Sequence, residues 1–397
     1  TEATEALRQA LQERLQVVPT EMGPMSLRKI SLRQLEAALQ DAADKDLGAL
    51  PDDLKYLAGI QRVQYILVYP DRQDIVLAGP GEGWVIGEQG AIVGQTTGRP
   101  VIKLEDLLVA LQATNASRET GISCSIDPTE EGIRAMRDYV SRQRTFNPGV
   151  LDGIQQALGA QQITLTGVSD TSHFARVLVA ADYRMKRIGM QLEDPPLPEL
   201  PSFLQLLAAS RYKPKNLMPR WWLACNYEPL ARSEDGLAWE LRGPGVKVMT
   251  EDDFVTDQGD VTTTGEQNPI AARWAEAMNQ SYEKLSVQQP VFGQLRNLMD
   301  LCVIAALMDQ EQLPDRAGCD LPILTGENGD FLPESWNPPK TVSSQCSMIK
   351  RGSEYIITAS GGVQINAYRY ASQAETNADV GTVHEKAEPK VDRWWWN

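Results

Sequence analysis

The sequence predicts an α+β protein with mixed helices and mainly antiparallel small sheets, including one βα-type unit. The chain has 397 residues, of which 42% are hydrophobic and 23% are charged, as in an ordinary globular protein. Stretches of helical periodicity alternate with short strand-like stretches, and clusters of proline and glycine separate them. At roughly 100–200 residues a domain, this length corresponds to two to three domains.

Residues 1–60 are predicted to form a helical N-terminal region. Leucines recur at helical spacing from Leu7 to Leu15 and again over residues 32–39, and Ser31 stands in the N-cap position of the second stretch. A third short helix is expected after Pro51.

Residues 61–193 are predicted to form an α/β domain that opens with an antiparallel meander. We expect the strands of this meander at residues 63–69, 75–78, 84–87 and 91–93. A helix at 104–111 leads to a unit of strand, helix, helix, strand and helix, expected at residues 121–126, 127–144, 150–158, 162–168 and 172–190. Asp127 is expected to cap the first of these helices. We expect the helices of the unit to pack on one face of a sheet, which the meander could extend.

A proline-rich segment at residues 195–201 predicts a boundary, and residues 194–370 then form a second α+β domain with two long helices. We expect its strands at residues 221–226, 237–241, 246–249, 347–350, 355–358 and 363–365. The two helices are expected at 269–285 and 290–308, each beginning at a proline. Residues 371–397 are predicted to be an extended C-terminal tail.

The charge and the hydropathy pattern exclude two classes of partner. The net charge is −15, so the acidic protein repels phosphate backbones, and we expect no nucleic acid partner. The best apolar run, residues 301–308, is shorter than the ~20 residues that cross a bilayer. It predicts a buried helix, and no transmembrane span is expected.

Two short motifs contain residue types used in binding or catalysis, but their contexts differ from those of functional sites. The glycine-rich segment 79–83 precedes a strand, whereas a dinucleotide-binding loop opens a helix. The segment Ser169–His173 contains serine, aspartate and histidine side by side, but a catalytic triad assembles across a fold. A helix start with Asp170 or Thr171 as its N-cap is the simpler interpretation.

No metal site or cofactor is expected. His173 and His384 are the two histidines, they are far apart in the sequence, and no CxxC pair accompanies them. The acidic loops 257–260 and 327–330 lack the spacing of a calcium-binding EF-hand. The prediction is therefore that no catalytic residue can be assigned.

Five cysteines leave at least one thiol unpaired within the chain. Cys319 and Cys346 flank a loop rich in proline, glycine and asparagine. They are the candidate disulfide, because a bridge there would restrain a long irregular segment.

The tryptophans give the most distinctive signal. Trp221 and Trp222 would point to opposite faces of a strand, one to the core and one outward. Trp394, Trp395 and Trp396 stand almost at the end of the sequence, where residues are usually polar. They either dock on the protein itself or anchor an interface with a second copy.

Several segments resemble an uncharacterised family of exported planctomycete proteins, a domain of unknown function. The resemblance lies in turn-and-strand patterns at residues 64–70, 77–84, 227–230, 235–241 and 360–365. It implies export to the periplasm, the cell surface or the medium, and it implies no activity. The sequence begins at Thr1, which is compatible with removal of a signal peptide and equally with a shortened chain.

These observations lead to one functional hypothesis and two alternatives. The first hypothesis is an extracytoplasmic structural protein of the cell envelope without catalytic activity, which forms a homo-oligomer through its tryptophan-ended tail. The first alternative is a cell-envelope hydrolase whose unrecognised site includes His173. The second is a module for cell-wall glycans, in which an exposed Trp222 or Trp84 stacks on sugar rings.

Overall fold

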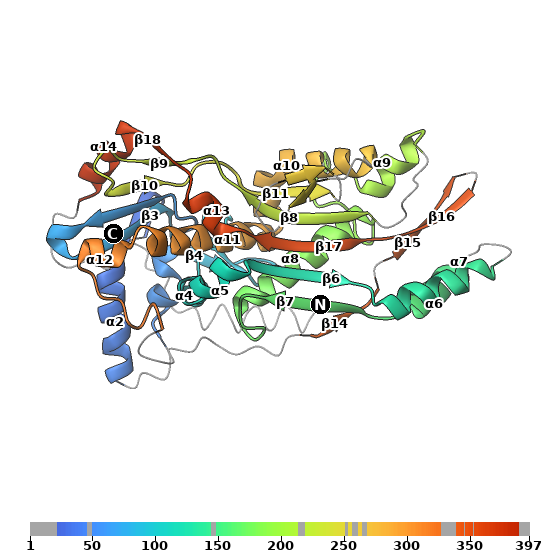
Figure 1. Cartoon of the computed structure of the whole chain (residues 1–397), viewed down its shortest axis with the longest axis horizontal. Helices are drawn as coiled ribbons and strands as arrows, with labels where there is room; N and C mark the ends of the chain where they lie inside the picture. Colours follow the sequence, from blue (N-terminus) through green and yellow to red (C-terminus); the bar gives the residue numbers. More distant parts are fainter. Residues whose placement is uncertain are drawn as a thin grey trace.

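Two six-stranded sheets and the helices between them make up most of the protein (Figure 1). The structure is a computed structural model, which describes residues 22–45, 50–143, 148–212, 219–250, 253–255, 261–263, 268–326, 339–344, 346–351 and 353–388. Its mixture of helices with small antiparallel and mixed sheets confirms the predicted α+β class.

The first sheet joins strands from four distant parts of the sequence. Its order is β1 (Met25–Ser31), β3 (Asp74–Gly81), β2 (Tyr65–Tyr69), β10 (Ala238–Glu240), β9 (Leu230–Arg232) and β18 (Ala374–Thr376). Neighbours are antiparallel except for β18, which runs parallel to β9. The strand at β1 corrects the prediction that residues 1–60 are helical, because its last residues are buried beside β3.

The second sheet carries the candidate site described below. Its order is β11 (Gly245–Thr250), β8 (Arg220–Asn226), β17 (Ser360–Ile365), β6 (Ile122–Asp127), β7 (Gln161–Thr166) and β14 (Thr341–Val342). Only the β8–β17 pair is parallel. The predicted meander does not extend this sheet, since β2 and β3 pair with β10 and β1 instead.

Both sheets therefore cross the boundary that the proline-rich segment predicts. In the first sheet β2 pairs with β10, and in the second β6 pairs with β17. The ranges 61–193 and 194–370 consequently do not each hold a sheet of their own. One main hydrophobic core also spans both ranges, with members from Met22 to Ala371.

Three helices pack against the inner face of the second sheet: α8 (His173–Gly189), α10 (Pro269–Gln288) and α11 (Pro290–Gln310). A fourth, α4 (Leu104–Gln112), packs on α8 and α11. By length and composition α11 could cross a membrane, and 89% of its apolar window is buried inside the protein. Burial all round is typical of the central helix of a globular core.

Shorter elements complete the described chain. The helices are α2 (Leu32–Asp44), α3 (Asp52–Lys55), α5 (Thr114–Glu119), α6 (Glu130–Ser141), α7 (Pro148–Leu158), α9 (Phe203–Ala209), α12 (Leu313–Ala317), α13 (Ala367–Ala371) and α14 (Ala378–Ala387), with 3-10 turns η1 (Leu57–Gly59) and η2 (Pro70–Arg72). The two-stranded sheets are β4 (Trp84–Ile86) with β5 (Ile92–Gly94), β12 (Asp253–Val255) with β13 (Val261–Thr263), and β15 (Cys346–Arg351) with β16 (Ser353–Thr358).

Helix starts follow their capping residues. Ser31 accepts a hydrogen bond from the N–H of Gln34 and begins α2, as predicted. Two other predicted caps are wrong by two residues or fewer: Thr129 rather than Asp127 caps α6, and Ser172 rather than Asp170 or Thr171 caps α8. In each case the hydroxyl that reaches the third helical N–H sets the start.

The predicted extended tail also needs correction over its first part. Residues 378–387 form α14, which Asn377 caps at the N-terminus. The buried Val380 and Ala387 attach this helix to a second hydrophobic cluster on the first sheet. The side chain of His384 stacks on Tyr69, with ring centroids 4.5 Å apart.

Candidate functional site

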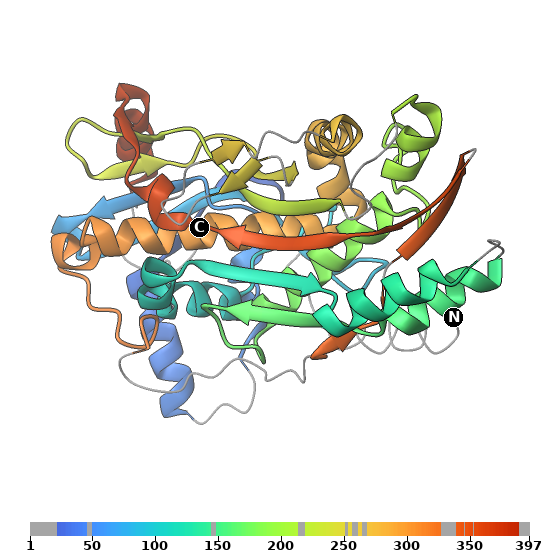
Figure 2. The ribbon, with the colours of Figure 1, turned by 45° about the vertical axis from the view of Figure 1, so that its right-hand side comes forward.

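The second sheet has one face that is covered by helices and one face on which most side chains are partly or fully exposed. The inward side chains, such as Trp221, Leu223 and Val363, are buried against the helices. Figure 2 shows β17 crossing in front of α11, with β8 above it and β6 and β7 below it, and the second face of the sheet is turned toward the viewer. At one end of this second face, α13 contributes the side chains of Arg369 and Tyr370. We call it the open face.

The strand register arranges the side chains of the open face in two rows. The first row runs across five strands through Met249, Trp222, Gly362, Ser125 and Thr164. The second, one step along each strand, runs through Lys247, Ala224, Gln364, Ser123 and Thr166. Apart from Trp222 and Met249, the rows consist of small or polar residues.

Trp222 therefore lies where the strand alternation predicts it. Trp221 is fully buried and contacts Trp274, with ring centroids 4.4 Å apart, whereas Trp222 is partly exposed on the open face. The guanidinium of Arg220 lies over the Trp222 ring at 5.5 Å from its centroid. Next to Trp222 on β17, Gly362 adds no side chain.

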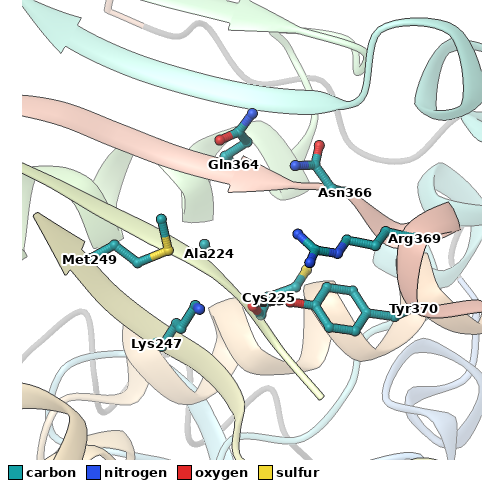
Figure 3. A pocket seen from close by; sticks show the side chains of 8 residues that line it. All are labelled: Ala224, Cys225, Lys247, Met249, Gln364, Asn366, Arg369 and Tyr370. Carbon is teal, nitrogen blue, oxygen red and sulfur yellow. Dashed lines mark hydrogen bonds between the residues drawn. The ribbon is translucent and has the colours of Figure 1, made fainter. Parts of the chain in front are cut away.

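A small pocket opens beside Trp222 on the same face. It has a volume of about 60 Å³ and is lined by Ala224, Cys225, Lys247, Met249, Gln364, Asn366, Arg369 and Tyr370. In Figure 3 Arg369 extends from α13 toward the middle of the pocket, and Lys247 reaches toward it from β11. The hydroxyl of Tyr370 donates to the carbonyl of Cys225 at 2.7 Å, which fixes the tyrosine ring in the wall.

The charged groups at this pocket are cations. Within the part of the chain that the structure describes, the side chains of Lys247 and Arg369 make no hydrogen bond or ion pair. Burial raises the pKa of Cys225 to about 12, so this lining residue stays a thiol at neutral pH and is a poor nucleophile. The pocket can therefore hold an anionic group.

His173 does meet a carboxylate, as the hydrolase alternative requires. Its Nδ1 lies 2.9 Å from Oδ1 of Asp106, and both residues are buried where α4 and α8 begin. The neighbouring Ser172 hydroxyl is used to start α8, because it donates to Ser169 and accepts from Ala175. Within the described ranges, no serine, threonine or cysteine side chain hydrogen bonds to the imidazole ring, so the pair lacks a nucleophile.

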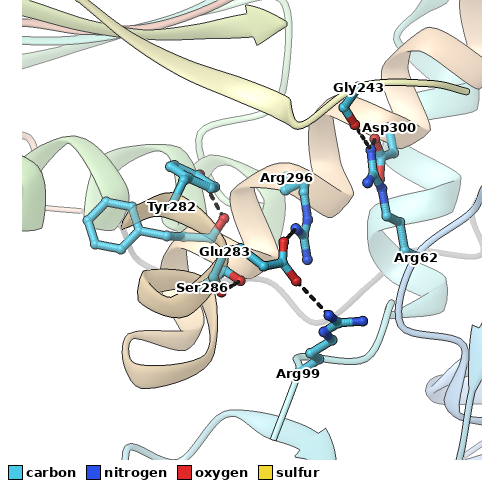
Figure 4. A network of polar contacts seen from close by, with 9 residues as sticks. Arg62, Arg99, Gly243, Tyr282, Glu283, Ser286, Arg296 and Asp300 are labelled. Atoms are coloured by element: carbon cyan, nitrogen blue, oxygen red, sulfur yellow. Dashed lines mark hydrogen bonds and ion pairs between the residues drawn. The ribbon is translucent and has the colours of Figure 1, made fainter. Parts of the chain in front are cut away.

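The remaining conspicuous polar groups form a network of ion pairs on α10 and α11 (Figure 4). Arg62 donates to Asp300 at 2.9 Å and to the carbonyl of Gly243, and the buried Tyr227 hydroxyl donates to Asp300 at 2.7 Å. The negative charge of Asp300 raises the pKa of Arg62 above its ordinary value. This arrangement attaches loops to the central helix.

A second part of the network centres on Glu283. Its carboxylate accepts from Arg296 and from Arg99, each at 2.6 Å. Burial opposes ionisation of Glu283, but the two arginines outweigh it and lower its pKa. Each carboxylate in Figure 4 thus has a cation partner and serves packing better than proton transfer.

The other candidate residues lie elsewhere. Trp394, Trp395 and Trp396 fall outside the described residues. Trp84 is 2% exposed and packs edge-on against Tyr56 in the core, so it cannot stack on a sugar. Across the described residues, no group of three or more histidine, cysteine, aspartate or glutamate side chains could hold a metal ion.

All five cysteines are buried free thiols, so the predicted Cys319–Cys346 disulfide is absent. Cys319 packs in the main core. Cys346 belongs to a separate small cluster with Val150 and Ile154. The two cysteines flank one loop in the sequence, but packing assigns them to different parts of the fold.

Comparison with known proteins adds one match. No curated protein and no solved structure matches this chain. The segments that carry the resemblance to an exported family lie outside the residues that match. Residues 124–203, which run from β6 to α9, match the model of a protein family described as a protein of unknown function (DUF1598).

Proposed function

We propose that this protein is a non-catalytic, extracytoplasmic binding protein that holds a saccharide on its open face. The observation that carries the proposal is the partly exposed Trp222, which lies on the same face of the sheet as the glutamine, serine and threonine side chains of β17, β6 and β7. An indole ring stacks on the apolar face of a sugar ring and has low conformational freedom to lose. Hydroxyl and amide side chains can both donate to and accept from sugar hydroxyls.

The sheet supports this role because it fixes the positions of the contacting groups. Trp222 is flanked on both sides by paired strands, β11 and β17, so its backbone cannot shift without breaking ladder hydrogen bonds. A binding site on strands is positioned more accurately than one on loops. The lack of a nucleophile beside His173, in the described part of the chain, favours binding over hydrolysis.

Binding of soluble cell-wall oligosaccharides to the wild type and to Trp222→Ala, measured by titration calorimetry, tests the proposal. We expect the wild type to bind, and the variant to bind at least about tenfold more weakly, as for truncation of an aromatic anchor. Trp222→Phe is the matched control, because it keeps an aromatic face and should keep part of the affinity. Near-ultraviolet circular dichroism checks that each variant is folded. If no oligosaccharide binds, or if Trp222→Ala binds unchanged, the proposal is wrong.

Self-association is a second proposed function, and one structural feature favours it. The hairpins α6–α7 and β15–β16 project together at one end of the molecule (Figures 1 and 2). They share a small apolar cluster that is separate from the main core. Met136 and Tyr139 on α6 stay only partly buried there, which leaves apolar area for a second copy.

Light scattering separates the assembly proposals. A chain ending before Trp394 should lose a large assembly if the tryptophans anchor it. Met136→Glu should dissociate an assembly that uses the projecting hairpins. A 43.9 kDa monomer at every concentration tested would refute self-association in both forms.

A further inference from the structure

The pocket of the open face has the size of one small polar group. At about 60 Å³ the pocket is far smaller than the roughly 300–1,000 Å³ of a site that encloses a whole small-molecule ligand, so it suits a small polar group such as a carboxylate. A larger ligand must therefore place one substituent in the pocket and the rest of its body on the sheet.

The donors around the pocket favour an anion. Arg369 supplies a planar fork of N–H groups and Lys247 supplies an ammonium, and the side-chain amides of Gln364 and Asn366 line the same space (Figure 3). Neither cation has an acidic partner among the described residues. In a chain with a net charge of −15, two convergent unpaired cations are not explained by packing or by solubility.

Trp222 and the pocket are adjacent by register. Trp222 and the pocket residue Ala224 are successive outward positions on β8, about 7 Å apart along a strand. The pocket residue Met249 pairs directly with Trp222 across β11 and β8. A ring lying on the indole is thus close enough to place a substituent in the pocket.

We propose that the pocket binds the carboxylate of an acidic saccharide whose ring lies on Trp222. This inference rests on the proposed saccharide-binding function and adds the chemical class of the ligand. The carboxylate accepts from the guanidinium of Arg369 and from the ammonium of Lys247. Arg220, which covers part of the indole, adds a third positive charge to the same face.

The test compares a uronic-acid oligosaccharide with its methyl ester, which has nearly the same shape and no charge. Titration calorimetry is done on the wild type, Lys247→Gln, Arg369→Gln and Trp222→Ala. Lys45→Gln is the matched control, because it removes one positive charge from an exposed position on the surface at the end of α2. We expect the wild type to bind the acid at least about tenfold more tightly than the ester.

Each outcome decides one of the two proposals. Lys247→Gln and Arg369→Gln should each weaken the acid about tenfold and leave the ester unchanged, while Lys45→Gln changes neither. Raising the salt concentration should reduce the difference between acid and ester. If acid and ester bind equally and Trp222→Ala weakens both, saccharide binding stands and the carboxylate assignment is overturned. If neither oligosaccharide binds, the saccharide function itself fails.

Discussion

Loss of Lys186 should strongly destabilise the sheet that carries the open face, because Lys186 and Asp182 form a buried ion pair. Both side chains are fully buried, one turn apart on α8. The ammonium of Lys186 donates to Asp182 at 2.8 Å, to the carbonyl of Ile126 at 2.8 Å and to that of Gly361 at 3.1 Å. The pairing of β6 with β17 ends at Ser125 and Gly362, one position before Ile126 and Gly361. Lys186 therefore supplies donors where the two strands separate.

Lys186→Met keeps the length of the side chain and removes all three donors. It takes one hydrogen bond from each of two backbone carbonyls and leaves the buried carboxyl group of Asp182 without its cation. Breaking a buried pair from one side costs about 3–5 kcal/mol of the free energy of unfolding. The exposed Asp41–Lys45 pair has the same spacing in the chain, and Lys45→Met there should cost less than about 1 kcal/mol.

Urea unfolding followed by circular dichroism measures both variants, with equal m-values as the condition for comparison. The double variant Asp182→Leu, Lys186→Met also removes the stranded carboxyl group. It should therefore be about 1–3 kcal/mol more stable than Lys186→Met alone. The reasoning is refuted if Lys186→Met costs no more than Lys45→Met, or if the double variant is less stable than the single one.

The pH dependence of this cost has a definite sign. Burial raises the pKa of Asp182 to about 7, and Lys186 opposes that rise, so the pKa climbs further in Lys186→Met. The folded carboxyl then keeps a proton that the unfolded chain releases near pH ~4, and the free energy of unfolding falls with pH up to the folded pKa. In the wild type the free energy of unfolding stops falling near pH ~7, whereas in Lys186→Met it continues to fall above that pH. The penalty should thus be larger at about pH 8 than at about pH 6.

Three further outcomes are expected. A thiol reagent should react slowly with the folded protein, because burial raises the pKa of the cysteines. After unfolding without a reductant it should titrate all five thiols, and a count of three thiols would indicate the predicted disulfide. Tyr227→Phe should lower the free energy of unfolding by about 1.5–3 kcal/mol in urea, since its hydroxyl donates to the buried Asp300, and an unchanged midpoint would contradict that role. Gly361→Ala should cost at least about 3 kcal/mol by the same measurement, because Gly361 has φ of 115° and a Cβ there would lie 1.9 Å from the carbonyl oxygen of Trp221; a stable variant would contradict it.

The local elements could be predicted from the sequence because their causes are local. The prolines at 269 and 290 begin α10 and α11, and the serine at 31 begins α2. Trp221 and Trp222 point to opposite faces as the period of a strand requires, one fully buried and the other partly exposed. Each of these features depends on residues only a few positions apart.

The arrangement of the strands could not be predicted, because pairing between distant segments leaves no local period. Nothing in residues 360–365 indicates that they lie parallel to residues 220–224. The same holds for the site, since Lys247 and Arg369 come from a strand and a helix that meet only in the folded chain. The free Cys319 and Cys346 show the converse, because closeness in sequence around one loop did not imply a contact.

The edge strands of both sheets are poorly suited to pairing with a strand from another molecule. The outer strands β14 and β18 have two and three residues, too short to template a new strand. Strand β1 is longer, but its register breaks between Met25 and Arg28, and Lys29 adds a charge. At β11 the side chain of Asn279 bonds both backbone groups of Val248. With these edges shortened, bulged or occupied, the face around Trp222 is the part of the second sheet best able to bind a partner.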